Sequence, residues 1–297
     1  MIDIKEKKDC CGCSACTEIC PKHCVHMVAD NEGFLYPQVD TTACIDCGLC
    51  EKVCPVINQN EPREPLAVYA AKNNNDEIRI KSSSGGIFTL LAEKIINEGG
   101  VVFGAKFNRN WDVVHDYTET INGLEAFRGS KYVQSAIGDN FKIVKQFLND
   151  GRKVLFSGTP CQIAGLKRYL QKEYNNLLTV DIICHGVPSF SIWEKYKNKV
   201  KELASYSCGN FASTNNKLIT LNDVNFRDKT NGWKHYMCTY SIVDVCSNLT
   251  NTLTYEHTQD PYMQLFLSNI IIKDFAFTST IYSEKNKNSQ TTKKNQN

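Results

Sequence analysis

The sequence predicts a small α+β module at the amino terminus, followed by an α/β domain with a largely parallel sheet and an appended β-hairpin region. Three observations carry this prediction. Two cysteine runs within residues 1–57 enclose two short strand-like segments, 25–29 and 34–39. Between residues 153 and 200, an apolar strand, a turn and a helix occur twice in succession, which predicts a βαβ unit with parallel pairing. After residue 205, strand-like runs alternate with polar turns.

The two cysteine runs share one spacing. Each has the order C-x2-C-x2-C-x3-C followed by proline, and the second repeats the first at an offset of 34 residues. The eight cysteines are Cys10, Cys13, Cys16, Cys20, Cys44, Cys47, Cys50 and Cys54. This is the spacing of bacterial two-cluster ferredoxins, in which three close cysteines and one distant cysteine hold each [4Fe–4S] cube. We therefore expect residues 1–57 to form a ferredoxin-like module with two [4Fe–4S] clusters.

The spacing also predicts which cysteines act together. Two residues between ligands let a tight loop point three thiolates at one cube, and the fourth cysteine leaves that loop and reaches the other cube. The predicted ligand sets are therefore crossed: Cys10, Cys13, Cys16 and Cys54 in one, and Cys20, Cys44, Cys47 and Cys50 in the other. Disulfide frameworks are typical of short secreted chains, and structural zinc favours separated C-x2-C pairs, so both are poor fits. Cys11 and Cys24 lie outside the pattern and are expected to be free thiols.

Length and charge limit the remaining possibilities. The 297 residues suggest about two domains, and 34 Lys and Arg against 32 Asp and Glu leave a net charge of +2. This balance predicts neither a nucleic-acid partner nor binding to an anionic membrane. No apolar run is long enough for a membrane span, and the first residues lack the apolar segment of a signal peptide. Fifteen cysteines without an export signal indicate a cytoplasmic protein.

The larger domain follows a polar linker. We expect the linker at residues 58–66, the α/β domain at 67–282 and a disordered tail at 283–297. Strands are predicted at 68–71, 101–107, 113–117, 153–157, 177–184, 224–227, 236–245 and 252–255. Helices are predicted at 87–98, 142–148, 162–170, 189–200 and 260–272.

Three segments of this domain are candidates for a cofactor site. The turns 157–161 and 184–188 follow two predicted parallel strands, and ligands bind beyond the carboxyl ends of such strands. The segment 82–86 offers small residues and free N–H groups where a helix begins, which suits the phosphates of a dinucleotide such as FAD. Serines before a helix are also common N-caps, so that segment has a purely structural alternative. Cys161 and His185 are similarly ambiguous between a reactive and a structural role.

Five ordered motifs carry a family resemblance. They are Ser-Ser-Ser-Gly-Gly (82–86), Phe-Arg-Gly-Ser-Lys-Tyr-Val-Gln-Ser (127–135), Gly-Thr-Pro-Cys-Gln-Ile-Ala-Gly-Leu (158–166), Cys-His-Gly-Val-Pro-Ser (184–189) and Asn-Phe-Arg-Asp-Lys (225–229). With the cysteine runs, the chain resembles the coenzyme F420 hydrogenase/dehydrogenase beta-subunit family, in the form with an N-terminal two-cluster ferredoxin domain. The likeness extends from about residue 8 to residue 269.

The resemblance implies an iron–sulfur flavoprotein oxidoreductase. It would pass electrons between its clusters and FAD, and exchange them with a deazaflavin (coenzyme F420), a ferredoxin, a hydrogenase or dehydrogenase subunit, or another redox partner. The implied flavin site comprises Ser83, Ser84, Gly85, Gly86, Lys131, Thr159, Pro160, Cys161, Gln162 and His185. Cys161 and Cys184 would help to ligate a third [4Fe–4S] cluster. From Ile270 onward the chain departs from the family pattern and lacks a Cys-x-x-Cys pair, so we expect a truncated or altered C-terminus and an incomplete third ligand set.

Three other functions remain open at this point. The protein could be a non-enzymatic electron-transfer subunit with the larger domain as a docking platform. It could also be a form without turnover because of the altered C-terminus. A hydrolase with a Cys161–His185 pair is the third alternative, although no further group is evident to orient the histidine.

Overall fold

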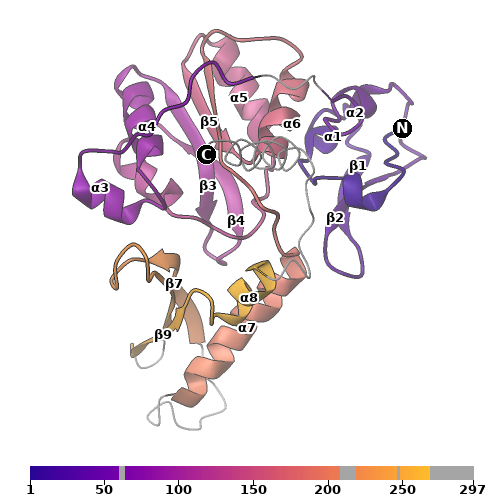
Figure 1. Cartoon of the computed structure of the whole chain (residues 1–297). Helices are drawn as coiled ribbons and strands as arrows, with labels where there is room; N and C mark the ends of the chain where they lie inside the picture. Colours follow the sequence, from indigo (N-terminus) through magenta and orange to yellow (C-terminus); the bar gives the residue numbers. More distant parts are fainter. Residues whose placement is uncertain (60–63, 208–218, 246–247, 268–297) are drawn as a thin grey trace, which may run out of the picture.

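The computed structural model describes residues 1–59, 64–207, 219–245 and 248–267, and begins with the cysteine-rich module (Figure 1). Strands β1 (Val25–Ala29) and β2 (Leu35–Val39) form where strands were predicted, and they pair antiparallel. After the 3-10 turn η1 (Lys7–Asp9), the short helices α1 (Ala15–Glu18) and α2 (Leu49–Lys52) carry one cysteine of each run. Each begins after a residue with positive φ, Ser14 or Gly48, which lets the chain turn sharply behind the cysteine loop.

The larger domain contains a four-stranded sheet in the order β4-β3-β5-β6. Its strands are β3 (Val101–Phe107), β4 (Val113–Thr118), β5 (Val154–Gly158) and β6 (Leu177–Asp181). The pairs β3–β5 and β5–β6 are parallel, and β4 is an antiparallel edge strand because a short turn joins it to β3. The prediction of a βαβ unit is confirmed, with α6 (Pro160–Leu170) as the crossover helix.

Helices cover both faces of this sheet (Figure 1). Alternate residues of a strand point to opposite faces, so Phe103 and Phe156 pack with α5 (Asn140–Asn149) and α6. Val102 and Leu155 pack on the other face with α4 (Ile87–Asn97) and the 3-10 helix η2 (Asn122–Phe127). The central strand β5 is fully buried, as expected for a strand covered on both sides.

A second sheet follows, with the antiparallel order β7-β8-β9. The strands β7 (Ile219–Asp228), β8 (Met237–Asp244) and β9 (Thr250–Glu256) pack against α7 (Phe190–Ser207) and α8 (Pro261–Leu267). Phe226, Tyr240, Tyr262 and Trp193 are almost fully buried where these elements meet. Each large side chain of this kind stabilises the fold by roughly 1.5–3 kcal/mol through burial.

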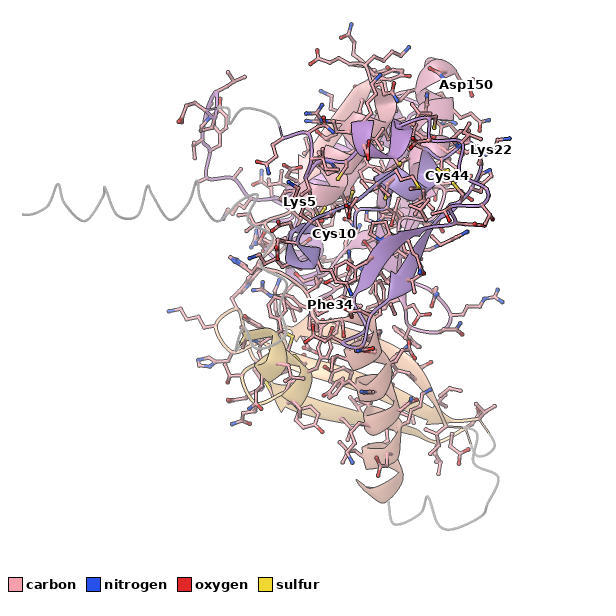
Figure 2. The ribbon with its side chains drawn as sticks, turned by 90° about the vertical axis from the view of Figure 1, so that its right-hand side faces the viewer. Lys5, Cys10, Lys22, Phe34, Cys44 and Asp150 are labelled. Carbon is pink, nitrogen blue, oxygen red and sulfur yellow. The ribbon has the colours of Figure 1, made fainter. Side chains whose placement is uncertain are left out.

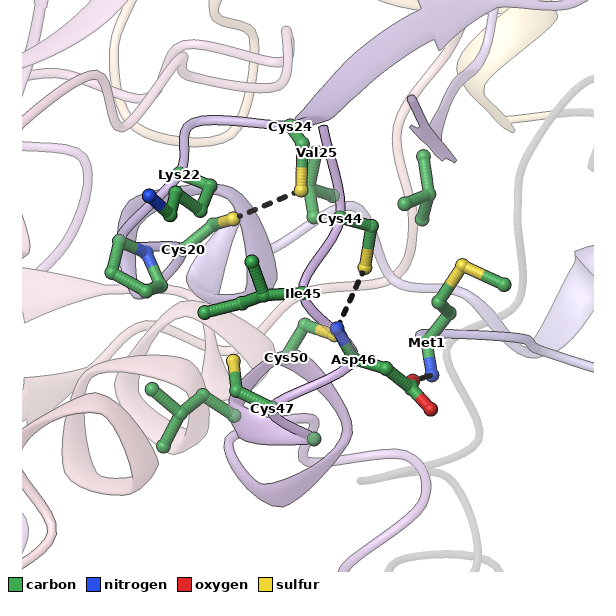
Figure 3. Close-up of a pocket in the computed structure, with 14 residues that line it drawn as sticks. Met1, Cys20, Lys22, Cys24, Val25, Cys44, Ile45, Asp46, Cys47 and Cys50 are labelled. Carbon is green, nitrogen blue, oxygen red and sulfur yellow. Dashed lines mark hydrogen bonds and ion pairs between the residues drawn. The ribbon is translucent and has the colours of Figure 1, made fainter. Parts of the chain in front are cut away.

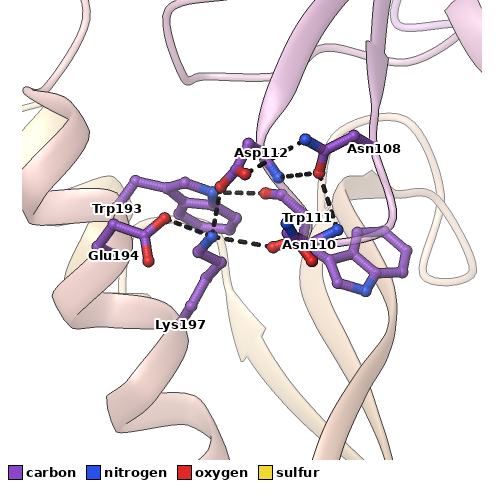
Figure 4. A network of polar contacts seen from close by, with 7 residues as sticks. All are labelled: Asn108, Asn110, Trp111, Asp112, Trp193, Glu194 and Lys197. Carbon is purple, nitrogen blue, oxygen red and sulfur yellow. Dashed lines mark hydrogen bonds and ion pairs between the residues drawn. The ribbon is translucent and has the colours of Figure 1, made fainter.

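A buried lysine fixes α7 against the turn between β3 and β4 (Figure 4). The ammonium of Lys197 donates to the carbonyl of Asn110 at 2.9 Å and lies 2.6 Å from a carboxylate oxygen of Asp112. Glu194 lies 2.5 Å away on the other side, and the indole N–H of Trp193 donates to the carbonyl of Trp111. The two sheets are therefore joined by polar as well as apolar contacts.

Several predicted elements differ from the structure. Residues 68–71 are not a strand, because no neighbouring strand pairs with them, and Val68 and Tyr69 are exposed. The helix α3 (Asp76–Lys81), capped by the Asn75 side chain, was not predicted, and β6 ends at Asp181 rather than at residue 184. The expected end of the last helix, the altered C-terminal segment and the tail at 283–297 lie outside the described residues. In the part that the structure describes, no helix is long and apolar enough to span a membrane.

Candidate metal and cofactor site

The first pocket gathers four cysteines from both runs. Cys10, Cys13 and Cys16 meet Cys54 around a space of about 300 Å³. We call these four residues the inner thiol set, and each is no more than 9% exposed. Apolar side chains close the pocket together with the additional thiol of Cys11; they are Ile2, Ile4, Met27, Pro37 and Val56.

The second pocket gathers the other four cysteines (Figure 3). Cys44, Cys47 and Cys50 meet Cys20 around a space of about 350 Å³, and we call these four residues the outer thiol set. Cys47 is exposed and Cys44 is half-buried. The backbone N–H of Asp46 donates to the Cys44 sulfur at 3.4 Å, and the extra thiol of Cys24 lies 3.4 Å from that of Cys20.

The donor chemistry of both pockets fits iron–sulfur clusters. Each pocket presents four cysteine sulfurs, the ligands that hold [4Fe–4S] cubes, and the described cysteines form no disulfide. Burial raises the pKa of the Cys16 thiol to about 12, so this thiol ionises only when a metal compensates its charge. Among the described residues, no group of three His, Cys, Asp or Glu side chains is arranged to bind one metal ion directly.

The inner set lies against the larger domain. A Cβ added to Gly165 of α6 would lie 3.1 Å from the Cys13 sulfur, so only glycine allows this approach without a shift. The side-chain amide of Gln134 donates to the carbonyls of Cys11 and Gly12. On the same side, the Glu18 carboxylate accepts backbone N–H bonds from the first turn of α5, at 3.1 Å for Lys142. The module therefore contacts the domain through the loop that carries Cys10, Cys13 and Cys16.

A buried polar chain holds the β5–α6 turn next to this loop. Thr159 N–H donates to the side-chain carbonyl of Gln162 at 3.0 Å, and the Gln162 amide donates to the Ser135 hydroxyl at 2.9 Å. His115 lies 2.8 Å from that hydroxyl through Nδ1 and 3.0 Å from the Ser157 carbonyl through Nε2. Because a carbonyl only accepts, Nε2 carries the proton and Nδ1 accepts from Ser135. Burial lowers the pKa of His115 to about 4.

Cys161 and Cys184 have different surroundings. The hydrogen bond that the Cys161 thiol donates to the Cys11 sulfur raises the pKa of Cys161 well above its ordinary value, and both thiols are buried. The Cys184 sulfur accepts from the backbone N–H of Gly186 at 3.4 Å, and burial raises its pKa to about 11. His185 is exposed on the segment after β6. No contact between described residues brings Cys161 and His185 together.

The Ser-rich loop opens onto a third pocket. Ser82, Ser83 and Gly129 line a space of about 720 Å³ together with residues at the end of β7. Ser130 and Ser83 hydroxyls lie 2.7 Å apart, while Ser84, Gly85 and Gly86 continue from the pocket to α4. The neighbouring Lys131 donates to the Arg128 carbonyl and lies over the Phe107 ring, and burial lowers its pKa to about 8.

The wall from the end of β7 carries two cations, Arg227 and Lys229, and one carboxylate, Asp228, and we call it the cationic wall. Arg227 stacks on Tyr236 with 4.3 Å between guanidinium carbon and ring centroid, and its Nε is buried without a hydrogen-bond partner. Lys229 donates to the carbonyls of Ile80 and Ser82 and lies over Trp233. Burial and the nearby Arg227 lower the pKa of Lys229 to about 8. The two positive charges repel each other. An anion bound between them would reduce this repulsion.

Comparison with known proteins identifies the family. A profile described as "Coenzyme F420 hydrogenase/dehydrogenase, beta subunit N-term" matches residues 68–140, and the corresponding C-terminal profile matches residues 151–253. Together they cover more than half of the chain. The chain belongs to the coenzyme F420 hydrogenase/dehydrogenase beta-subunit family. A 4Fe-4S dicluster domain profile matches residues 9–58, which include all eight patterned cysteines, so this family member carries an iron–sulfur domain.

Several known proteins are similar to parts of the chain. The chain is 23% identical over 198 residues to a subunit of the F(420)H(2) dehydrogenase of Methanosarcina mazei, covering 62% of this chain and 55% of that protein. It is 46% identical over 43 residues to a 7Fe ferredoxin of Hydrogenibacillus schlegelii, covering 14% and 49%. A chain of the F420-reducing [NiFe] hydrogenase complex from Methanosarcina barkeri aligns with a TM-score of 0.40 and 16% identity, covering 66% and 64%. The chain spans about half the length of the curated relatives it matches.

Some residues of the site were missing from the sequence prediction. Arg227, Lys229 and Ser135 stood in recognised motifs but were not assigned to the site, and His115 and Glu18 were not considered as site residues. Contacts such as that of Lys229 with Ser82 join residues that are 147 positions apart, so no local pattern reveals them. The sequence feature that could have indicated the cationic wall is the Asn-Phe-Arg-Asp-Lys motif (225–229), which contains both Arg227 and Lys229.

Proposed function

We propose that this family member is an iron–sulfur flavoprotein oxidoreductase that transfers electrons between two [4Fe–4S] clusters and a flavin. The grouping of the eight patterned thiols, four around each of two pockets, is the observation that carries the proposal. The inner set would hold one cluster and the outer set the other, in the crossed arrangement. When bound, such clusters supply one-electron chemistry.

The residues around the thiols have separate tasks. Ile2, Ile4 and Val56 keep water from the inner set, which favours the less charged state of a bound group. The Asp46 N–H donates to Cys44 and stabilises negative charge on that sulfur. Gly165 lets α6 approach Cys13 closely, so the inner set lies at the side of the module that meets the β5–α6 turn.

The flavin would bind in the third pocket and at the neighbouring strand ends. Arg227 and Lys229 suit the pyrophosphate of FAD, since both are cationic and Arg227 has an unused buried donor. Ser83 and the backbone of Gly129 add hydrogen-bonding groups, and Lys131 lies next to them along the chain. When bound, a flavin supplies paired-electron, hydride-type chemistry. Thr159 and Gln162 would border the site through the turn that follows β5.

The exchange partner is proposed from the name of one relative and from the chemistry of the clusters. The relative named for F(420)H(2) supports a deazaflavin as the two-electron partner, and the one-electron chemistry of two [4Fe–4S] clusters suits a one-electron protein partner. A third cluster at Cys161 and Cys184 is not part of the proposal, because the Cys161 thiol is hydrogen-bonded to Cys11.

Electron counting tests the proposal. The anaerobically purified full chain is titrated with dithionite while the visible absorption of cluster and flavin is followed. Two clusters accept about one electron each and a flavin about two, so we expect about four electrons per chain. About two electrons without a flavin signal would instead support a non-enzymatic electron carrier, and no uptake would exclude both functions.

A further inference from the structure

The two thiol sets differ in their access to solvent. All four inner cysteines are buried, and the larger domain lies against their loop through Gly165 and Gln134. In the outer set, by contrast, Cys47 is exposed, and neighbouring Ile45 is 59% exposed. Electron exchange between proteins requires a short distance between the redox centres, so the outer set is the one a second protein can approach.

The residues around the outer set form a continuous surface. Pro21, Lys22, Ile45 and Cys47 all line the outer pocket and are all exposed; we call these four residues the outer face (Figures 2 and 3). Figure 2 faces the module and shows Lys22 beside Cys44 at its edge, with Cys10 farther toward its middle. This surface therefore presents the apolar side chain of Ile45 next to the exposed Cys47, together with the charged side chains of Lys22 and Asp46.

The charges of this surface favour an acidic partner. Asp46 lies 3.1 Å and Glu51 3.2 Å from the Met1 amino group, so these two carboxylates share one ammonium. Lys22 makes no ion pair with any residue that the structure describes, and the exposed Lys52 makes none either. An unpaired cation at the rim attracts carboxylates of an approaching protein and speeds the encounter.

A small coenzyme is a poorer occupant. The space at the outer set is bounded by the cysteine sulfurs and their loops, so a cluster would fill it. The third pocket is the larger space and carries Arg227 and Lys229. Small anionic ligands are therefore expected there, and a macromolecule at the outer face.

We infer that the outer face is the docking surface for an acidic redox protein that exchanges single electrons with the outer thiol set. This inference rests on the proposed function. A cluster held by the outer set would accept one electron from the reduced centre of the partner, and no bond would form or break. Such encounters bury little surface and dissociate readily, which suits repeated electron delivery.

Stopped-flow reduction tests the docking surface. The probe is a reduced, acidic two-[4Fe–4S] ferredoxin mixed with the oxidised full chain under anaerobic conditions. Lys22→Glu should lower the second-order rate constant about tenfold at low ionic strength and less at high salt, since screening weakens the repulsion. Ile45→Glu should lower it at both salt concentrations. Val28→Glu is the matched control, because Val28 is 44% exposed on β1 and lines neither thiol pocket, and its rate should equal that of the wild type.

Cross-linking provides a readout that does not depend on electron transfer. A carbodiimide should join Lys22 to carboxylates of the ferredoxin, and the joined peptides are identified by mass spectrometry. Equal rates in all variants, or cross-links confined to other lysines, would overturn the docking surface. The dithionite titration separates this failure from failure of the proposed function. If the chain takes up about four electrons but the ferredoxin rates are equal in all variants, only the docking surface is rejected.

Discussion

Gly165 and Cys13 are in such close contact that a methyl group on Gly165 would lie 3.1 Å from the Cys13 sulfur and 3.2 Å from its Cβ. The contact joins α6 of the larger domain to a patterned cysteine of the module. It makes the position of one thiol depend on an element that belongs to another part of the chain.

Gly165→Ala should therefore disturb the inner set selectively. Replacing a helical glycine by alanine stabilises a helix by about 1 kcal/mol, whereas overpacking costs about 1–3 kcal/mol. We expect a net loss of about 1 kcal/mol in the free energy of unfolding and an altered electron paramagnetic resonance signal from one of two clusters. Lys167→Ala, on the exposed side of the same helix, is the control. A more stable variant with unchanged signals would show that the contact is unimportant.

The buried His115 should make stability depend on pH. The folded protein keeps this imidazole neutral down to about pH 4, while the unfolded chain protonates it near pH 6.5. The unfolded state then binds more protons between these values, so the contribution of His115 is complete above pH 6.5 and is lost as the pH falls. The difference in unfolding free energy between the wild type and His115→Gln should shrink by about 2 kcal/mol from pH 7.5 to 5. Urea denaturation measures it, and a constant difference would contradict the assignment.

The cationic pocket should control flavin retention. Arg227→Gln combined with Lys229→Gln removes two positive charges, so flavin bound per chain should fall at least tenfold while iron content stays unchanged. Lys199→Gln, an exposed substitution on α7, should leave both contents at the wild-type level. Absorbance after gel filtration measures the flavin. Full retention in the double variant would place the flavin elsewhere.

Two lysines on one helix should differ in their effect on stability. Lys197→Met leaves Asp112, whose side chain is 35% exposed, without its cation and the Asn110 carbonyl without its donor, and losing such charge-assisted hydrogen bonds costs about 1.5–3 kcal/mol. The Lys197 side chain is 6% exposed, whereas Lys199 is 55% exposed and pairs only with Glu202. Lys199→Met should therefore cost less than about 1 kcal/mol. Chemical denaturation of both variants compares them, and equal losses would mean that the network adds nothing.

Elements with local signals could be predicted from the sequence. The apolar run of β5, the turn at Thr159 and the helical spacing of α6 lie within 17 residues, and all three were confirmed. The segment 68–71 has an equally apolar pattern but no partner strand, because strand pairing depends on distant residues. Its expected strand was therefore wrong.

The same distinction applies to the site. The repeat spacing indicated which thiols would gather, because ligand spacing follows from the geometry of a cube. It did not indicate that Cys11 would meet Cys161, or that Cys24 would lie 3.4 Å from Cys20. The cationic wall on β7 and the His115 chain depend on contacts across the whole domain, which only the folded structure brings together.

Iron and acid-labile sulfide in the anaerobically purified chain test the central claim most directly. The account predicts about eight of each per chain, falling to about four or fewer in Cys13→Ala and Cys44→Ala. Cys11→Ala and Cys24→Ala, which remove the additional thiols of the two pockets, should retain about eight. Zinc in place of iron, or an equal loss in the Cys24→Ala and Cys44→Ala variants, would contradict two clusters held by the eight patterned cysteines.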